Sequence, residues 1–326
     1  AERLTWTVAD GTEIEGWLIR PVGYEAGRPY PMILKIHGGP HGAYGNTFFR
    51  TFHVLSNTGF FVLYTNPRGS TGYGTAFSKQ HQGDYAGKEF DDIVDAKRAL
   101  VAEGVTDADR TGITGGSYGG FASAWGATYY SSEYAASVMF VGISNNISKF
   151  GTTDIPNEMY LVHERKWPWE EWDHLLERSP IYHVDKAETP ILIMHGAEDT
   201  RVSPTQSYEL YRNIKVRKPD TPVRLVLYPG EGHGNSRAAA RYDYNLRMMQ
   251  GFDTYLKTGD RDAELPDPQP MLAEAARGLT GDVEARNDLT LRIQHLSPRI
   301  HADTRVGVVH TGGVPRRVER RALYLV

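Results

Sequence analysis

Few folds accommodate the way in which short apolar runs alternate with longer helical stretches in this sequence. The apolar runs lie at residues 32–36, 60–65, 110–114, 135–141, 191–194 and 223–228. Continuous apolar runs of this length are typical of strands that are buried on both faces of a sheet. Stretches with helical length and periodicity lie at 44–55, 88–103, 118–130, 204–216 and 238–256. The alternation predicts an α/β fold with a mostly parallel central sheet and helices on both faces.

The two ends of the chain depart from this alternation. Near the start, residues 4–8 and 13–19 flank a turn-forming Asp-Gly pair and predict a β-hairpin. Beyond residue 257 the sequence has no lysine, arginine is frequent, and three prolines gather at 266–270. We therefore expect one α/β domain over residues 1–258 and a C-terminal extension of uncertain structure over residues 259–326.

Residues 154–179 interrupt the alternation with a charged segment that contains Trp167, Trp169 and Trp172. The segment is expected to be a mostly helical insertion. Its aromatic rings can fasten the insertion to the domain surface, as aromatic side chains commonly do, or they can belong to a cap over a cleft and contribute to specificity. The sequence leaves both interpretations open.

Charge and composition exclude several classes of function. The 36 basic and 40 acidic side chains leave a formal charge of −4, which gives no electrostatic reason to expect nucleic acid or an anionic membrane as a partner. No apolar run approaches the roughly 20 residues of a membrane helix, so we expect a soluble protein without membrane insertion, with the cytoplasm favoured. Because the sequence has no cysteine, it has no thiolate nucleophile, disulfide or cysteine-bound metal.

A glycine-rich hexapeptide, Gly-Gly-Ser-Tyr-Gly-Gly at residues 115–120, joins the predicted strand at 110–114 to the predicted helix at 118–130. A serine on a sharp strand-to-helix turn is the arrangement of a nucleophile elbow, in which strained backbone projects the hydroxyl above the sheet. The flanking glycines permit a close approach of strand and helix. The placement predicts that Ser117 is a nucleophile.

A serine hydroxyl needs a base to take its proton, and His233 is the best placed of the 12 histidines. It lies in a glycine-flanked loop between the last predicted strand and the last predicted helix. Loops at the carboxyl ends of parallel strands gather at one edge of a sheet, where such a base can reach Ser117. We therefore predict that His233 is the general base.

The acid that orients the base is expected after the strand at 191–194, where the sequence offers Glu198 and Asp199. We predict Asp199 and keep Glu198 as the alternative. The resulting order along the chain, serine then acid then histidine, is the order of α/β-hydrolases. The sequence thus predicts an α/β-hydrolase fold with a catalytic triad of Ser117, Asp199 and His233.

Acyl transfer also needs two hydrogen-bond donors for the oxyanion that forms on the attacked carbonyl. One candidate is the backbone N–H of Tyr118, directly after the nucleophile. The other is the backbone N–H of Gly39, in the loop His-Gly-Gly-Pro-His-Gly at residues 37–42. A metal site of His37 and His41 is the competing interpretation, but no third ligand with fixed spacing lies nearby, so we do not expect a metal there.

Five motifs, in this order, resemble the catalytic domain of the prolyl oligopeptidase family of serine peptidases over residues 1–258. They are His-Gly-Gly-Pro at 37–40, Asn-Pro-Arg-Gly-Ser-Thr-Gly-Tyr-Gly at 66–74, the serine hexapeptide, His-Gly-x-x-Asp-x-Arg-Val at 195–202 and Gly-His-Gly at 232–234. The resemblance implies hydrolysis of peptide bonds in short peptides through an acyl-enzyme, with no metal or organic cofactor. It is closest to the acylaminoacyl-peptidase and dipeptidyl-peptidase branches.

The resemblance also implies residues that bind the substrate. The family's pocket for the residue before the scissile bond corresponds here to Ile143, Asn146, Phe150 and Val202. Arg201 corresponds to a position that meets a substrate carbonyl.

Two departures from the family pattern modify these expectations. A tyrosine that helps to form the oxyanion hole in the dipeptidyl-peptidase branch corresponds here to His37, which favours the acylaminoacyl-like branch. Family members also carry a β-propeller that restricts access to the site. No part of this sequence resembles a propeller, so we expect a more open cleft.

Three functions are compatible with these residues. The main prediction is a serine peptidase that acts on short peptides. A carboxylesterase or lipase-like enzyme that acts on small esters would use the same triad. A non-catalytic binding protein with a hydrolase fold is disfavoured, because Ser117, Asp199 and His233 are all present. The oligomeric state is left open by the sequence.

Overall fold

The computed structural model describes residues 1–265 of the chain, so most of the extension expected at 259–326 lies outside the described residues. The core of the described part is an eight-stranded sheet with the strand order β1-β2-β4-β3-β5-β6-β7-β8. Neighbouring strands from β4 to β8 pair in parallel, whereas β1 and β2 pair antiparallel at one edge. The predicted mostly parallel sheet is confirmed.

The strands follow the apolar runs, with one that is longer than expected. They are β1 (Glu2–Thr7), β2 (Glu13–Ile19), β3 (Tyr30–Ile36), β4 (Phe61–Asn66), β5 (Thr106–Gly116), β6 (Ala136–Phe140), β7 (Ile191–Gly196) and β8 (Val223–Tyr228). The predicted hairpin is β1–β2. Strand β5 begins at Thr106 rather than at residue 110, because Thr106 already pairs with Tyr30 ahead of a register shift. The polar residues before that shift concealed the start of the strand.

The helices also match the predicted stretches, apart from their ends and the additional short ones. They are α1 (Arg50–Asn57), α2 (Thr75–Ser78), α3 (Lys88–Ala102), α4 (Tyr118–Thr128), α5 (Asn146–Thr152), α6 (Trp172–Glu177), α7 (Thr205–Arg217) and α8 (Ala238–Phe252). Helix α1 begins at Arg50 rather than at residue 44. The cause is Asn66, whose side chain accepts from the N–H of Tyr44 at 2.7 Å and donates to its carbonyl at 2.9 Å, which holds Tyr44 in a loop.

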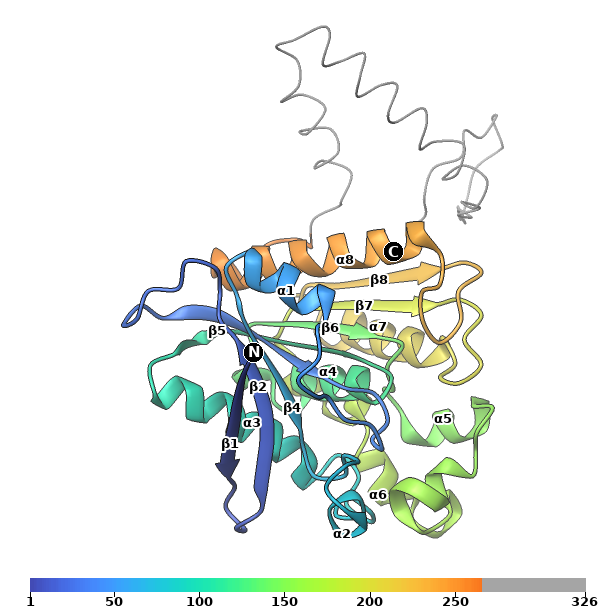
Figure 1. Cartoon of the computed structure of the whole chain (residues 1–326). Helices are drawn as coiled ribbons and strands as arrows, with labels where there is room; N and C mark the ends of the chain where they lie inside the picture. Colours follow the sequence, from blue (N-terminus) through green and yellow to red (C-terminus); the bar gives the residue numbers. More distant parts are fainter. Residues whose placement is uncertain (266–326) are drawn as a thin grey trace, which may run out of the picture.

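Helices cover both faces of the sheet (Figure 1). One face packs against α1 and α8, and the other packs against α3, α4 and α7. Side chains alternate between the two faces along each strand. In β7, for example, Leu192 belongs to the core on the α8 side, whereas Ile191 and Ile193 belong to the core on the α7 side.

The insertion at 154–179 is built from short helical pieces, of which α6 is one. The ring of Trp167 stacks on that of Trp169, with 5.2 Å between the ring centroids, and its edge approaches Phe150 of α5. Trp167 therefore links the insertion to α5, in agreement with the fastening interpretation. Trp169 and Trp172 remain 58% and 45% exposed.

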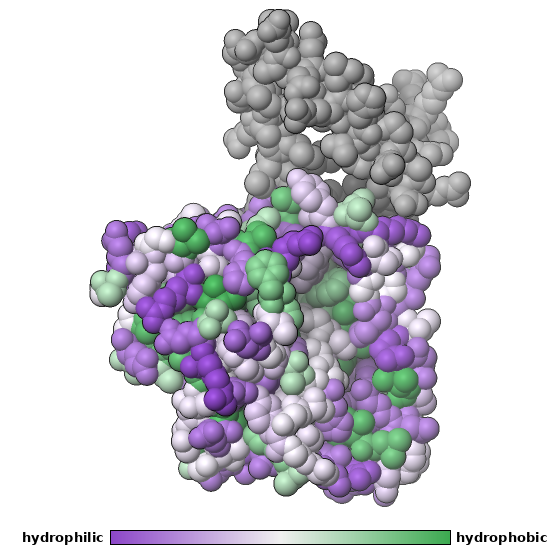
Figure 2. Space-filling model, viewed as in Figure 1, coloured by the Kyte–Doolittle hydropathy of each residue, from purple (hydrophilic) through white to green (hydrophobic). Residues whose placement is uncertain are grey.

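The surface of the described part mixes polar and apolar residues on the face that Figure 2 shows. On the face shown in Figure 2, apolar residues form small groups among polar ones. Within residues 1–265, none of the helices has the length and apolar character that a membrane crossing requires.

The close packing of α4 on β6 gives a testable prediction. A Cβ atom added at Gly120 would lie 2.4 Å from the carbonyl oxygen of Phe140 and 2.7 Å from Cα of Gly142. Because backbone atoms cannot yield easily, Gly120→Ala should lower the free energy of unfolding by about 1–3 kcal/mol. Urea-induced unfolding measures this change.

Gly151 of α5 is the matched control, since an added Cβ there meets nothing within 4 Å. Gly151→Ala should leave the free energy of unfolding unchanged or raise it by up to about 1 kcal/mol. Equal stabilities of the two variants would contradict the packing argument.

Candidate active site

Ser117 lies in the turn between β5 and α4, where the sequence places it. Its backbone angles are φ 59° and ψ −119°, a combination that residues with a side chain rarely adopt. The N–H of Ser117 donates to the carbonyl of Phe140 in the neighbouring strand at 3.0 Å. The turn therefore has the strained backbone of a nucleophile elbow.

Glycines around this turn let three backbone segments meet. A Cβ atom at Gly115 would lie 2.4 Å from the carbonyl oxygen of Ile36, and one at Gly119 would lie 2.2 Å from the same oxygen. Any larger residue would push β3 away from the turn. The glycine-rich hexapeptide is thus required by the close approach of β3, β5 and α4.

Asp199 and His233 are brought together by the loops after β7 and β8. Nδ1 of His233 lies 2.8 Å from Oδ2 of Asp199. The other carboxylate oxygen, Oδ1, accepts from the backbone N–H groups of Arg201 at 2.9 Å and Val202 at 3.0 Å. The side chain of Asp199 is fully buried, whereas that of His233 is 29% exposed. The carboxylate is therefore fixed inside, and the imidazole reaches the surface.

The surroundings of Asp199 keep it ionised. Burial alone would raise the pKa of its carboxyl, but the donors of His195 and His233 and the N–H of Val202 together hold that pKa well below its usual range. A permanently charged carboxylate beside Nδ1 favours the imidazole orientation in which Nδ1 carries the proton. Nε2 is then left free to accept one.

Ser117 and His233 lie at the same edge of the sheet, because β5, β7 and β8 are parallel and each residue follows the carboxyl end of its strand. The hydrogen bonds of the described residues include none between the Ser117 hydroxyl and the His233 ring. The structure thus joins the acid to the base, and the contact of the base with the nucleophile stays a prediction.

The two predicted oxyanion donors lie on either side of Ser117. Tyr118 is the first residue of α4, where N–H groups have no acceptor within the helix. The loop with Gly39 packs on the turn, since a Cβ added at Gly38 would lie 3.3 Å from the carbonyl of Gly116 and 3.6 Å from Cβ of Ser117. Gly39 itself has φ 134°, which favours glycine.

The side chain of Tyr118 is hydrogen-bonded to a buried carboxyl group, that of Glu89. The hydroxyl of Tyr118 donates to Oε1 of Glu89 at 3.2 Å, and Glu89 also accepts from the N–H of Gly87 at 3.1 Å. Burial raises the pKa of Glu89 to about 8, despite these donors. The side chain of Tyr118 is thus held by a carboxyl that is mostly protonated at neutral pH.

The residues implied for the substrate pocket divide into buried and accessible ones. Ile143 and Val202 are buried in one apolar cluster with Tyr118. Asn146 is fully buried: its N–H donates to Ser179 at 3.0 Å and its side-chain amide to the carbonyl of Arg178 at 2.8 Å. These three side chains therefore lie beneath the surface of the protein.

Phe150 and Arg201 are more accessible. Phe150 is partly buried and borders the rings of Trp167 and Trp169. The guanidinium of Arg201 is exposed and donates to the carboxylate of Asp154 at 2.7 Å. A substrate carbonyl would therefore compete with Asp154 for Arg201.

Comparison with known proteins places this geometry in a family. A model of the prolyl oligopeptidase family matches residues 46–258. The uncharacterized peptidase YuxL of Bacillus subtilis is 40% identical over 240 residues, which are 72% of this chain and 36% of that protein. The chain belongs to the prolyl oligopeptidase family.

Other members of the family are similar over comparable lengths. Dipeptidyl aminopeptidase BIII of Pseudoxanthomonas mexicana is 34% identical over 80% of this chain and 40% of its own length. The acylamino-acid-releasing enzyme of Rattus norvegicus is 32% identical over 75% of this chain and 34% of its own length. The chain therefore spans only 34–40% of the length of these relatives.

Solved structures share the fold. The acylaminoacyl peptidase of Pyrococcus horikoshii aligns with a TM-score of 0.69 and 27% identity over 82% of this chain and 42% of that one. A puromycin-hydrolyzing peptidase of Mycobacterium tuberculosis aligns with a TM-score of 0.72 and 24% identity over 78% and 39%, which shows the fold alone. The predicted α/β-hydrolase fold and the family resemblance are confirmed.

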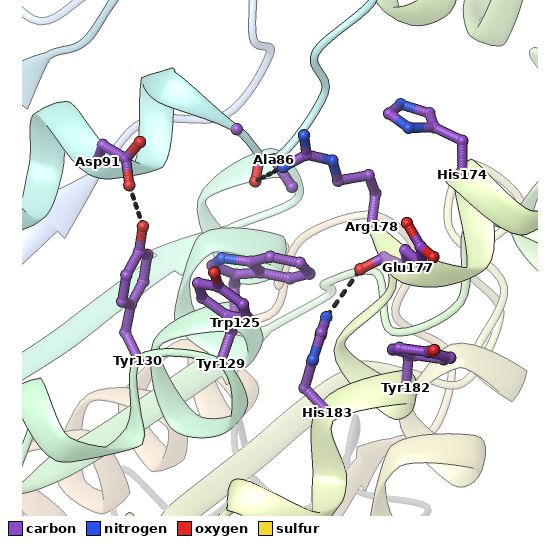
Figure 3. Close-up of a pocket in the computed structure, with 11 residues that line it drawn as sticks. Ala86, Asp91, Trp125, Tyr129, Tyr130, His174, Glu177, Arg178, Tyr182 and His183 are labelled. Atoms are coloured by element: carbon purple, nitrogen blue, oxygen red, sulfur yellow. Dashed lines mark hydrogen bonds between the residues drawn. The ribbon is translucent and has the colours of Figure 1, made fainter.

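A separate cavity lies at the other end of α4 (Figure 3). It has a volume of about 370 Å³ and is lined by Trp125 of α4, by Tyr129 directly after that helix, by Arg178 and by other residues of the insertion and the segment after it. Figure 3 shows Arg178 donating to the carbonyl of Ala86, which links the insertion to the start of α3. None of the three triad residues lines this cavity.

Sequence analysis missed two contacts of the site. His195 lies 3.2 Å from the Asp199 carboxylate, and Glu89 lies under Tyr118. A histidine four positions before the acid is a signal for the first contact. Nothing near Glu89 in the sequence indicates the second.

Within residues 1–265, no group of three histidine, aspartate, glutamate or cysteine side chains has an arrangement that could hold a metal ion.

The raised pKa of Glu89 predicts how stability depends on pH. The folded protein holds this proton more tightly than the unfolded chain, whose carboxyl has a pKa of 4.5. The associated stability is fully present below that value and is lost as the pH rises through about 8. Glu89→Gln has no such proton, so its free energy of unfolding should fall less than that of the wild type from pH 5 to pH 9. Urea unfolding at several pH values measures the difference.

Glu103→Gln is the control, because Glu103 is an exposed acid at the end of the same helix. It changes the net charge by the same amount and should follow the wild-type pH dependence. The interpretation of Glu89 fails if Glu89→Gln also follows the wild-type curve.

Proposed function

We propose that this chain is the catalytic part of a serine peptidase that hydrolyses short peptides through an acyl-enzyme at Ser117. The observation that carries the proposal is the hydrogen-bonded Asp199–His233 pair, at the same edge of the sheet as the strained Ser117 turn. The relatives that are named as peptidases support this reaction class. No cofactor enters the reaction.

The first half of the reaction forms the acyl-enzyme. The hydroxyl oxygen of Ser117 attacks the carbonyl carbon of the scissile bond while Nε2 of His233 takes the hydroxyl proton. Asp199 holds Nδ1–H of His233 and stabilises the imidazolium that results. The tetrahedral oxyanion accepts from the N–H groups of Tyr118 and Gly39. Its collapse breaks the C–N bond, and His233 donates its proton to the departing amine.

The second half regenerates the enzyme. Water attacks the acyl carbon, and His233 removes a proton from that water. The second tetrahedral intermediate uses the same two N–H donors. When it collapses, the C–O bond to Ser117 breaks, the proton returns from His233 to the serine oxygen, and the carboxylic acid leaves. The side chain before the scissile bond would lie along Phe150, above Ile143 and Val202.

We propose compounds with an N-acylated aminoacyl group as the first substrates to test. His37, which corresponds to the oxyanion tyrosine of the dipeptidyl-peptidase branch, is buried, and its Nε2 lies 2.9 Å from the hydroxyl of Ser70. The ring of His37 is thus hydrogen-bonded within the protein rather than to a substrate. The backbone amide of Gly39 is the donor that this loop retains.

Labelling with a fluorophosphonate tests the nucleophile. The wild type should be labelled at Ser117, and Ser117→Ala should lose both the label and turnover, with kcat lower by roughly 10⁶-fold. Mass spectrometry of the modified peptide locates the label. Hydrolysis of N-acetylaminoacyl p-nitroanilides measures turnover.

The substrate panel separates the peptidase from an esterase with the same triad. p-Nitrophenyl acyl esters are measured beside the anilides, and both activities should disappear in Ser117→Ala. Turnover of the esters alone by the wild type would replace the peptidase proposal with an esterase. A folded wild type that is neither labelled nor active would reject both.

The identity of the acid gives a separate prediction. Asp199→Asn should lower kcat by about 10⁴-fold, because an amide no longer fixes His233 in the reactive tautomer. The comparison is Glu198→Gln, the alternative acid next to it in the sequence, which should retain wild-type kcat. Steady-state kinetics on one substrate measures both variants. A large loss in Glu198→Gln, with Asp199→Asn near wild type, would assign the role to Glu198.

A further inference from the structure

A second imidazole contacts the carboxylate of Asp199. His195 is the last residue but one of β7, and its Nε2 lies 3.2 Å from Oδ2 of Asp199. The same Nε2 lies 2.8 Å from the carbonyl oxygen of Val202, and Nδ1 lies 2.7 Å from the hydroxyl of Ser207 in α7. The side chains of His195 and Asp199 are both fully buried. The reaction steps proposed above do not use this histidine.

These contacts determine where the proton of His195 lies. Nε2 faces two oxygens, the Asp199 carboxylate and the Val202 carbonyl, and both can only accept a hydrogen bond. Nε2 therefore carries the proton. Nδ1 can then accept from Ser207, whose hydroxyl is able to donate. Each ring nitrogen has a partner, so the ring is held in one orientation.

His195 completes the set of donors around the carboxylate. Oδ1 accepts from the N–H groups of Arg201 and Val202, whereas Oδ2 lies 2.8 Å from Nδ1 of His233 and 3.2 Å from Nε2 of His195. Val202 donates to the Asp199 carboxylate through its N–H and accepts from His195 through its carbonyl. The imidazole of His195 therefore links the end of β7 to the far side of the loop that follows it. Ser207 ties that ring to α7. Asp199 thus has little freedom to rotate.

We propose that His195 is a positioning residue for the triad: it holds the Asp199 carboxylate so that Oδ2 stays aligned with Nδ1 of His233. The inference rests on the proposed role of Asp199. Without the Nε2–H donor, Oδ2 would turn toward whatever donor remains, and His233 would lose its fixed orientation. A small displacement of a catalytic group can cost on the order of 10²-fold in rate.

Two substitutions of His195 separate the donor from the bulk of the ring. His195→Leu fills the space but removes the donor, and should lower kcat by roughly 10²-fold with KM within about twofold of the wild type. His195→Gln places an amide N–H₂ near the position of Nε2, and should recover most of the lost kcat. Steady-state kinetics on the same p-nitroanilide measures kcat and KM. Active-site titration with a fluorophosphonate counts the competent enzyme.

His183→Leu is the control for the loss of a histidine that contacts a backbone carbonyl. Nε2 of His183 lies 2.7 Å from the carbonyl of Glu177, and its side chain lines the cavity of Figure 3, which none of the triad residues lines. This variant should keep the wild-type kcat. Thermal unfolding of all the variants shows whether each one is folded.

The outcomes distinguish this inference from the proposed function. A folded His195→Leu with wild-type kcat, or a His195→Gln no more active than His195→Leu, would overturn the positioning role while the triad stands. If His195→Leu does not fold, Ser207→Ala decides, since it frees Nδ1 by removing one hydroxyl and should lower kcat severalfold at unchanged KM. Wild-type kcat in Ser207→Ala would then overturn the inference. If the wild type is neither labelled nor active, the proposed function itself is rejected.

Discussion

The edge of the sheet that carries the candidate triad depends on how closely backbone segments approach one another around Ser117. The carbonyl of Ile36 in β3 lies where any side chain at Gly115 or Gly119 would have to be, and Gly120 meets Gly142 in the same way. This packing holds Ser117 at φ 59°. The strain is offset by burial, because every residue of α4 is buried. The hydroxyl of Ser117 and the N–H of Tyr118 are consequently held in one fixed relation.

Two buried carboxyl groups near this edge, those of Asp199 and Glu89, are in opposite protonation states. Burial acts on both, but Asp199 is surrounded by donors that outweigh it, so its pKa stays low and the group remains charged. For Glu89 burial prevails, and its pKa of about 8 keeps it mostly protonated at neutral pH. The site thus places one negative charge beside His233 and a neutral support beneath Tyr118. Environment, rather than residue type, sets the two roles.

The sequence was informative wherever a signal is local. Apolar runs located the strands, and the positions of Ser117, Asp199 and His233 after strand ends located the candidate triad. The failures involve contacts between distant residues. Helix α1 begins late because Asn66 binds the backbone of Tyr44, which no pattern near residue 44 indicates.

The same limit explains what was missed in the site. His195 has no predicted role beyond its place in the motif at 195–202, because its contacts with Val202 and Ser207 exist only once the loop after β7 has closed. Helix α5 is short, Asn146–Thr152, and its N-cap Asn145 accepts from Ile147 and Ser148. Seven residues are too few for helical periodicity to be visible.

The order of the strands along the chain also sets the order in which the parts of the site are synthesised. A chain leaves the ribosome from its N-terminus, so the central strands β3, β4 and β5, together with the Ser117 turn, are made before β7 and β8. Domains generally fold as units while they are synthesised. His233 follows the last strand, and a nascent chain therefore carries the serine without its base until the sheet can close. The proposed triad can therefore be assembled only after β8 and the loop that carries His233 have been made.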